Sequence, residues 1–159
     1  MAQTDDLTVE QFARLLQGKG RLLGLDLGSK TIGLAICDDR WSIASPVHTI
    51  RRRKFTLDVE DMLAYAAKEG VVGLVIGLPL NMDGSEGPRA QSTRAFVRNL
   101  SKHTSLPVLY WDERLSSFAA DQAMLEADLS RAKRAKNIDQ MAAAVILQGA
   151  IDRMSAIAI

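Results

Sequence analysis

The apolar residues of the chain fall into short uninterrupted runs separated by polar turns, a pattern that predicts a β-sheet. The first two runs flank a short turn, so we expect them to form an antiparallel hairpin. The third run contains Pro46, which favours an edge strand or a bulge because proline has no N–H to donate. The fourth is apolar throughout, as is typical of a parallel strand buried on both faces. The predicted strands are 21–27, 31–37, 42–50, 71–79 and 106–113.

Apolar residues at helical spacing predict helices before, between and after these strands. Thr8 and Gln11 have the spacing of a capping box at the start of a short helix. The helix that follows the third strand stops at Gly70, since glycine is common just past the C-terminus of a helix. The basic segment 131–137 has no apolar periodicity, so we expect a connector there. The predicted helices are 8–16, 56–70, 88–103, 115–128 and 138–154.

The order of these elements predicts an α/β fold. Three strands at the front are followed by alternating helices and strands, which indicates a mixed five-stranded sheet with helices on both faces. The first three strands are expected to be antiparallel and the later ones parallel. A chain of 159 residues lies in the usual range for one domain. We therefore assign residues 21–159 to one domain and residues 1–20, with their short helix, to an N-terminal extension.

The composition is that of a soluble globular protein, with 47% hydrophobic and 25% charged residues. The formal net charge is only +1, so any affinity for nucleic acid must come from local clusters of basic residues. The single cysteine, Cys37, excludes an internal disulfide and is expected to be a small buried residue. No run is long and apolar enough for a membrane span, and the N-terminus carries acids where a signal peptide is basic. We expect a cytoplasmic protein without a membrane partner.

Carboxylates stand at three positions with apolar neighbours: Asp26 ends the first strand, Asp112 and Glu113 end the last strand, and Asp139 begins the last helix. A charged carboxylate in such surroundings costs on the order of several kcal/mol unless it is paired, capped or bound to a cation. Taken singly, each has a structural explanation. Asp26 can cap the turn that follows it, Glu113 can pair with a nearby arginine, and Asp139 can favour a helix N-terminus.

Taken together, the three positions indicate a metal site. Ligand sites of open α/β sheets gather where strand ends meet helix starts, and carboxylates that converge there repel one another unless a cation lies between them. Mg²⁺ or Mn²⁺ fits such a set, because a hard cation takes one or two carboxylates and keeps water and phosphate oxygens as further ligands. Two such ions about 4 Å apart can activate a water and stabilise the leaving oxygen of a phosphodiester.

Four stretches resemble the signature stretches of the YqgF (RuvX) family, small bacterial ribonuclease H-like proteins described as pre-16S rRNA nucleases or Holliday junction resolvases. These stretches are GLDLGSKTIGLAI, VIGLPLNMDGSEGPRA, WDERLSS and NIDQMAAAVILQ, and the match spans about residues 21–152. The resemblance implies a ribonuclease H-like sheet and a site in which Asp26, Glu113 and Asp139 are both metal ligands and catalytic residues. It also implies a nuclease for structured RNA or branched DNA, which acts in 5′-end maturation of pre-16S rRNA or in junction resolution.

Residues around the acids are candidates for binding the substrate. The loop at 77–88 lies between a strand end and a helix start, so its backbone N–H groups and the helix dipole can hold a phosphate. The basic run at 131–136 leads into Asp139 and would bring phosphates to the acids, whereas the run at 51–54 is interpreted as a solvated loop. Arg114 either contacts the scissile phosphate or pairs with Glu113. The substrate-binding candidates are Gly28, Lys30, Asn81, Asp83, Gly84, Arg89, Arg94, Arg114, Arg131, Lys133, Arg134 and Lys136.

Two other functions stay open as alternatives. DLGSKTIG also resembles the first phosphate loop of the sugar kinase, actin and heat-shock ATPase group, but those proteins need a second such domain, which 159 residues cannot supply. A nucleic-acid-binding or ribosome-assembly factor without activity can have the same fold, although the presence of all three acids favours the nuclease. A resolvase is expected to act as a twofold dimer that cuts two strands symmetrically. The sequence leaves both a monomer and a homodimer open.

Overall fold

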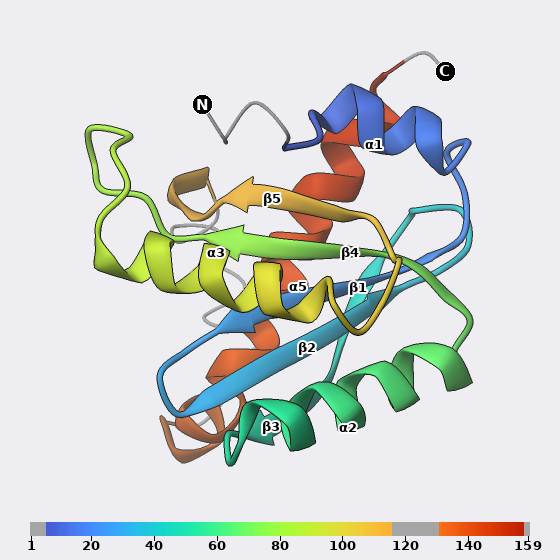
Figure 1. Cartoon of the computed structure of the whole chain (residues 1–159). Helices are drawn as coiled ribbons and strands as arrows, with labels where there is room; N and C mark the ends of the chain where they lie inside the picture. Colours follow the sequence, from blue (N-terminus) through green and yellow to red (C-terminus); the bar gives the residue numbers. More distant parts are fainter. Residues whose placement is uncertain (1–5, 116–130, 158–159) are drawn as a thin grey trace.

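Five strands form the centre of the molecule: β1 (Arg21–Leu27), β2 (Thr31–Cys37), β3 (Ala44–Arg51), β4 (Val71–Leu78) and β5 (Val108–Asp112). The computed structural model describes residues 6–115 and 131–157, and for 131–137 it describes the backbone only. The strands form one sheet in the order β3-β2-β1-β4-β5 (Figure 1). β1, β2 and β3 pair antiparallel, whereas β4 pairs parallel with both β1 and β5. The predicted mixed α/β sheet is therefore confirmed.

β3 lies at one edge of this sheet, as the proline in its sequence indicates. Its register with β2 shifts between Leu34 and Ala35, and Ala35 pairs with Pro46. Because proline cannot donate a hydrogen bond to a neighbouring strand, an edge position with an irregular register accommodates it.

Helices cover both faces of the sheet (Figure 1). α2 (Phe55–Lys68) and α3 (Pro88–Leu100) pack on one face, and α5 (Arg131–Ser155) crosses the other face with α1 (Val9–Leu15) against it. A short 3-10 helix, η2 (Glu113–Leu115), follows β5. Among the described residues, no helix has both the length and the apolar character needed to cross a lipid bilayer.

The residues of β1 alternate between the two faces, and this alternation determines on which side Asp26 lies. Leu25 and Leu27 are buried among side chains of α2 and α3, whereas Leu22 packs with α5. Because alternate residues of a strand share a face, Asp26 lies on the α5 side, together with Leu22 and Gly24.

Two glycines let α5 approach the hairpin of β1 and β2 closely. A Cβ atom at Gly24 would lie 2.8 Å from Cβ of Leu147. A Cβ atom at Gly33, the residue paired with Asp26, would collide with the backbone carbonyl oxygen of Asp139. The missing side chains therefore set the distance between α5 and the strands, and with it the position of Asp139.

The structure corrects the sequence prediction at the start of α5. The predicted connector at 131–137 is wrong, because these residues form the first turns of α5. Ala, Lys and Arg are strong helix formers, so the segment needs no apolar stripe to be helical. Asp139 consequently lies well inside α5 rather than in its first turn, and the helix-terminus explanation for this acid no longer applies. The predicted helix at 115–128 falls outside the described residues beyond Leu115.

The N-terminal helix α1 is part of the core. The side chain of Thr8 accepts a hydrogen bond from the Gln11 N–H, and the Gln11 side chain accepts one from the Thr8 N–H, so the predicted capping box is confirmed. Phe12 and Ala13 of α1 are fully buried in the cluster that includes α5. The division of the chain into an extension and a domain that starts at Arg21 stays a prediction.

The replacement Gly33→Ala is expected to lower the free energy of unfolding by about 1 to 3 kcal/mol, because the added methyl group would push α5 away from β2. Urea denaturation at neutral pH measures this loss. Gly87→Ala is the control, since a Cβ atom there would first meet the exposed side chain of Asn81, at 3.1 Å, and not backbone. Equal stability of Gly33→Ala and the wild-type chain would contradict the close packing of α5 on β2.

Candidate functional site

The three predicted acids come from separate elements and meet on the α5 side of the sheet. Asp26 lies near the end of β1, Glu113 opens η2 directly after β5, and Asp139 lies in α5. The charge of Asp139 acts on Asp26, and the charge of Asp26 acts on Glu113. Asp26 is therefore the central member of the group, and all three side chains are partly buried.

Gly77 on β4 makes room for Glu113, just as Gly33 on β2 makes room for Asp139. A Cβ atom at Gly77 would lie 2.7 Å from Oε2 of Glu113. β2 and β4 are the two neighbours of β1 in the sheet. Asp26 thus has a glycine-bearing strand on each side, and the other two acids approach it over these glycines.

Burial raises the pKa of Asp26 from 3.8 to about 6; the charge of Asp139 adds to this rise, and Arg89 opposes it. Burial also raises the pKa of Glu113 from 4.5 to about 7, again with a contribution from a neighbouring acid, Asp26, and with Arg89 in opposition. Raised carboxylate pKa values that arise from burial and from like charges are frequent at functional sites.

Thr31 holds Asp139 in place. The Thr31 hydroxyl, on the first residue of β2, donates a hydrogen bond of 2.7 Å to Oδ2 of Asp139. The contact crosses from the hairpin to α5, so it links two segments that are far apart in the sequence. Sequence reasoning did not single out Thr31, although its position directly after the turn that follows Asp26 is a signal that could have found it.

Arg89 supplies positive charge near the acids. It occupies the second position of α3, is exposed, and lowers the pKa of both Asp26 and Glu113. No side chain caps the start of α3 at Gly87, and Pro88 at the first helical position has no N–H. Arg89 is thus close enough to act on the charge of two of the acids, and its contact with substrate stays a prediction.

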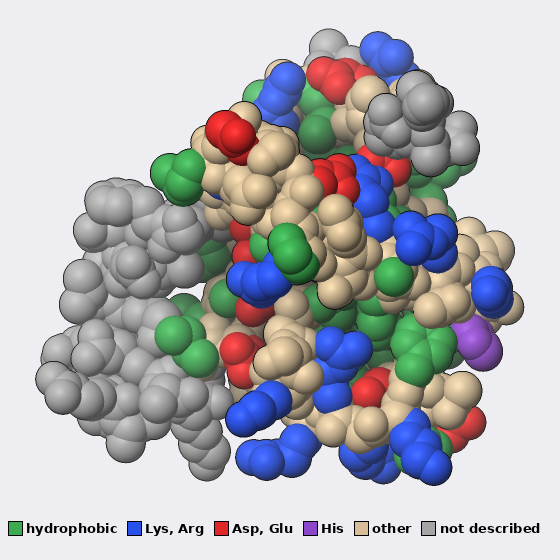
Figure 2. Space-filling view, turned by 60° about the vertical axis from the view of Figure 1, so that its left-hand side comes forward, with side chains coloured by type: hydrophobic (Ala, Val, Ile, Leu, Met, Phe, Trp, Pro, Cys, Tyr) green, Lys and Arg blue, Asp and Glu red, His purple; other side chains and the backbone are tan. Residues whose placement is uncertain are grey.

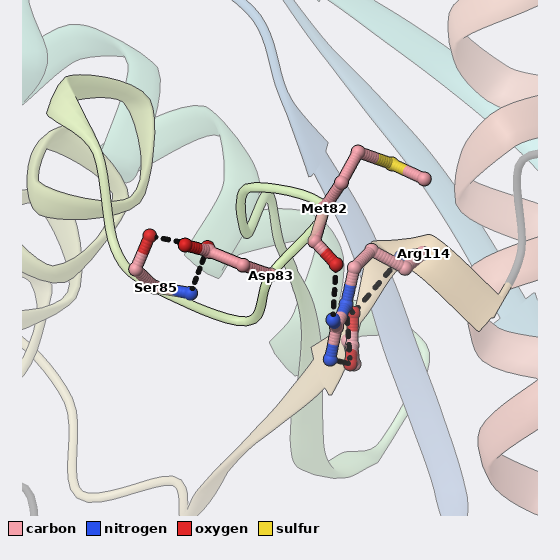
Figure 3. A network of polar contacts seen from close by, with 5 residues as sticks. Met82, Asp83, Ser85 and Arg114 are labelled. Atoms are coloured by element: carbon pink, nitrogen blue, oxygen red, sulfur yellow. Dashed lines mark hydrogen bonds and ion pairs between the residues drawn. The ribbon is translucent and has the colours of Figure 1, made fainter.

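The loop between β4 and α3 is held together by its own polar groups (Figure 3). Oδ1 of Asp83 accepts hydrogen bonds from the Ser85 N–H and the Ser85 hydroxyl, at 2.9 and 2.6 Å. Nδ2 of Asn81 donates to the Ser85 hydroxyl at 3.0 Å, and the Gly84 N–H donates to the Asn81 carbonyl oxygen at 2.8 Å. Gly84 has a positive φ of 89°, which glycine adopts readily. Asn81, Asp83 and Gly84 therefore shape this loop, and contact of these residues with substrate stays a prediction.

Arg114 fastens the same loop to the end of β5 (Figure 3). Its guanidinium pairs with the carboxylate of Asp112, with an NH2–Oδ2 distance of 2.7 Å, and its NH1 group donates to the Met82 carbonyl oxygen at 3.1 Å. Two roles were expected for Arg114, contact with the scissile phosphate or pairing with Glu113. In the structure Arg114 pairs with Asp112 and not with Glu113. Asp112 in turn accepts the Arg114 backbone N–H at 2.9 Å, which fixes the turn in which Glu113 lies.

The other substrate-binding candidates have varied surroundings. Arg94 forms ion pairs of 2.8 Å with both Asp6 and Glu86 and stacks on the ring of Tyr110. Lys30 is exposed in the turn between β1 and β2. The four remaining candidates belong to α5, but their side chains lie outside the described part of the chain: Arg131, Lys133, Arg134 and Lys136.

Arg52 contacts the turn at Gly28, although it is not among the substrate-binding candidates predicted from the sequence. NH1 of Arg52 donates a hydrogen bond of 2.6 Å to the Gly28 carbonyl oxygen, and the Arg52 N–H donates one of 2.8 Å to the Lys30 carbonyl oxygen. Arg52 belongs to the basic run at 51–54, which on sequence alone has the pattern of a solvated loop. Only the fold shows that this run lies beside the turn that follows Asp26.

The donor set has the chemistry that a hard divalent cation requires. Three carboxylates with mutual repulsion and no histidine or thiolate ligand favour Mg²⁺ or Mn²⁺ over Zn²⁺. Within the described residues, no three His, Cys, Asp or Glu side chains lie close enough together to hold a metal ion between them. Mg²⁺ takes only one or two protein carboxylates and fills its other positions with water and substrate oxygens.

The chain is similar to proteins of one family along most of its length. Residues 20–153 match the family model described as "RuvX: Holliday junction resolvase". A relative from Rhodobacter capsulatus is 58% identical over 147 residues, which cover 92% of each chain. One from Zymomonas mobilis is 61% identical over 141 residues, which cover 89% of this chain and 86% of the relative. Both relatives carry the name "Putative pre-16S rRNA nuclease".

A solved structure has a similar fold. It is described as T. thermophilus RuvC in complex with Holliday junction substrate, and it superimposes with a TM-score of 0.55 at 13% identity. The superposition covers 85% of this chain and 96% of that chain. At this low identity the likeness concerns the fold, and it confirms the ribonuclease H-like sheet implied by the sequence motifs.

Without a metal ion at neutral pH, the variant Asp26→Asn is expected to be more stable than the wild-type chain. Because the pKa of Asp26 rises from 3.8 to about 6 on folding, the wild-type chain loses stability as the pH rises through this interval. The variant lacks this titration, so its advantage in unfolding free energy should grow by about 2 kcal/mol between about pH 4 and about pH 7. Urea unfolding in EDTA at a series of pH values measures the difference.

Asp38→Asn is the control, because folding lowers the pKa of Asp38 whereas it raises the pKa of Asp26. The pKa of Asp38 is lowered, chiefly by a hydrogen bond from the Ile43 N–H, so the charged form of Asp38 stabilises the folded state above that pKa. Asp38→Asn should therefore bring no gain in stability at neutral pH. A difference between Asp26→Asn and wild type that does not change with pH would contradict the raised pKa of Asp26.

Proposed function

Because this chain belongs to the RuvX (YqgF) family of nucleases, we propose that its three carboxylates form a metal-dependent active site that hydrolyses phosphodiester bonds in structured nucleic acid. The observation that supports this most directly is the convergence of Asp26, Glu113 and Asp139, with Asp26 electrostatically coupled to both of the others. The name of the curated relatives favours precursor 16S rRNA as the substrate. Cleavage at its 5′ end, in the cytoplasm, is part of the same proposal.

Asp26, Glu113 and Asp139 are the residues that would hold Mg²⁺ or Mn²⁺. A bound ion of this kind supplies an activated water and stabilises the leaving oxygen of the phosphodiester. Thr31 orients Asp139 through the bond to Oδ2, and the Asp112 to Arg114 pair fixes the turn that presents Glu113. The positive charge of Arg89 attracts the phosphate backbone to this otherwise acidic place.

One alternative substrate rests on specific observations. The family model is described as a Holliday junction resolvase, and the solved structure with a similar fold is a complex with a Holliday junction, so a four-way DNA junction is the second candidate substrate. A resolvase would act as a homodimer, whereas an RNA nuclease could act as a monomer. The alternative from another class is an inactive ribosome-assembly factor with the same fold.

The wild-type chain is expected to cleave precursor 16S rRNA with Mg²⁺ or Mn²⁺ and not in EDTA, and Asp26→Asn is expected to abolish cleavage. A parallel assay on a synthetic four-way DNA junction distinguishes the two substrates, and analytical ultracentrifugation gives the oligomeric state. Asp39→Asn is the control, because Asp39 is an exposed acid in the turn between β2 and β3. Undiminished cleavage by Asp26→Asn would overturn the proposal, and so would the absence of cleavage by wild type on both substrates.

Thr31→Val is expected to lower the affinity for Mg²⁺ by about 10-fold, because it removes the hydroxyl that orients Asp139 and keeps the shape of the side chain. The measurement is the Mg²⁺ concentration that gives half-maximal cleavage. Thr31→Ser retains a hydroxyl and should stay close to wild type. If the serine and valine variants were equally impaired, the role of Thr31 would lie in packing and not in its bond to Asp139.

A further inference from the structure

A cavity of about 320 Å³ lies beside the carboxylate site, on the α3 side of the sheet. Its wall begins at Leu27 and Gly28, the two residues after Asp26, and Arg89 at the start of α3 also contributes to the lining. Arg89 thus borders the cavity and also acts on the carboxylates. Among the described residues, no Asp or Glu lines the cavity, and the charged groups that line it are basic.

Arg52 is held in a fixed position in this wall. Its NH1 group donates to the Gly28 carbonyl oxygen at 2.6 Å, and its guanidinium carbon lies 5.6 Å from the centre of the Phe96 ring. A guanidinium fixed by a hydrogen bond and by contact with an aromatic ring loses little entropy when it binds a ligand. Within the described part of the chain Arg52 has no acidic partner, and its remaining N–H groups are available to an anion.

The rest of the lining also suits a phosphate. Ser29 and Ser92 bring hydroxyl groups to the wall, and Phe96 closes it with an apolar ring. The cavity adjoins the first turn of α3, whose positive dipole end has no side-chain cap. A cavity lined by two guanidinium groups and by hydroxyl donors matches the bidentate recognition of phosphate oxygens by arginine.

We infer that this cavity binds a backbone phosphate of the nucleic acid, adjacent to the phosphodiester presented to the carboxylates. The inference rests on the proposed function, because it takes the ligand to be the strand that is cut. RNA and DNA share the phosphate, so the cavity fixes the register of the strand and does not distinguish the two sugars. In the space-filling view, Lys and Arg side chains gather along the lower part of the face that is shown (Figure 2).

The competing explanation is diffuse attraction by this basic surface. Arg51, Arg53, Lys54 and Lys30 are all exposed near the cavity and would attract any polyanion without a defined subsite. A test must therefore compare two changes of equal charge, one inside the cavity and one outside. Ser92 lines the cavity, whereas its exposed neighbour Gln91 on α3 does not.

The experiment compares Ser92→Asp with Gln91→Asp, each in the Asp26→Asn background so that the probe is not cut. Ser92→Asp places a carboxylate where the phosphate would bind, and we expect it to weaken binding about 10-fold relative to Gln91→Asp and to lower the slope of log affinity against log salt by about one. The probes are a fluorescent RNA stem-loop and a fluorescent four-way DNA junction, with binding followed by anisotropy in Mg²⁺. Both positions are exposed, so both variants should fold, which thermal unfolding checks.

A second pair of variants tests the guanidinium directly. Arg52→Ala is expected to weaken binding more than Arg51→Ala, although each removes one positive charge from the same basic run. Equal weakening within both pairs would overturn the inference and leave only diffuse attraction. A larger loss of affinity in Ser92→Asp than in Gln91→Asp, on either probe, supports the cavity as a phosphate site for that polymer.

The outcomes separate this inference from the proposed function. Selective loss of binding in Ser92→Asp, in a chain that cleaves neither substrate, would support the cavity and overturn the nuclease. The opposite result is metal-dependent cleavage by the wild-type chain together with equal binding by Ser92→Asp and Gln91→Asp. It would support the nuclease and overturn the cavity as a phosphate site.

Discussion

The close packing of α5 on the central hairpin is the constraint on which the site depends. Gly33 allows the backbone of Asp139 to lie directly against β2, and Gly24 allows Leu147 to approach β1. The position of Asp139 relative to Asp26 is therefore set by contact between main chains and not by the choice of a flexible rotamer. Because protein interiors are packed at nearly crystalline density, a methyl group added at this contact would be transmitted as a shift of the whole helix. The geometry of the acids is a property of the fold.

This arrangement has an electrostatic cost that the rest of the fold must offset. Burial and like charges raise the pKa of Asp26 and Glu113, and the exposed cation Arg89 opposes this only in part. The stability comes from the two apolar clusters on either side of the sheet, and Asp26 and Glu113 belong to neither cluster. A group of acids that is unfavourable by itself, and that a divalent cation would relieve, is what a metal-dependent site requires before it is loaded.

The sequence predicted the sheet well because its strands carry local signals. The hairpin of β1 and β2, the edge position of the strand with Pro46 and the buried strand β4 are each indicated by a turn, a proline or an apolar run. The start of α5 was not predictable from the spacing of apolar residues, because this basic segment is helical without an apolar stripe. Thr31 and Arg52 were missed because their importance comes from contacts across the fold, with Asp139 and with the turn at Gly28. Burial of the acids themselves also depends on tertiary packing.

The end of β1 separates opposite charges, which in the proposed function act on the same polyanion. Asp26 and Leu27 are neighbours in a strand, so they lie on opposite faces, with the acids on the α5 side and the basic cavity on the α3 side. If both groups lay on one face, Arg52 would pair with the carboxylates. The carboxylates would then be less able to bind a cation, and Arg52 would be less able to bind a phosphate. Gly28 follows directly and adds no side chain between the two sides. In the proposed complex, a strand of nucleic acid would pass over this glycine and present one phosphate to each side.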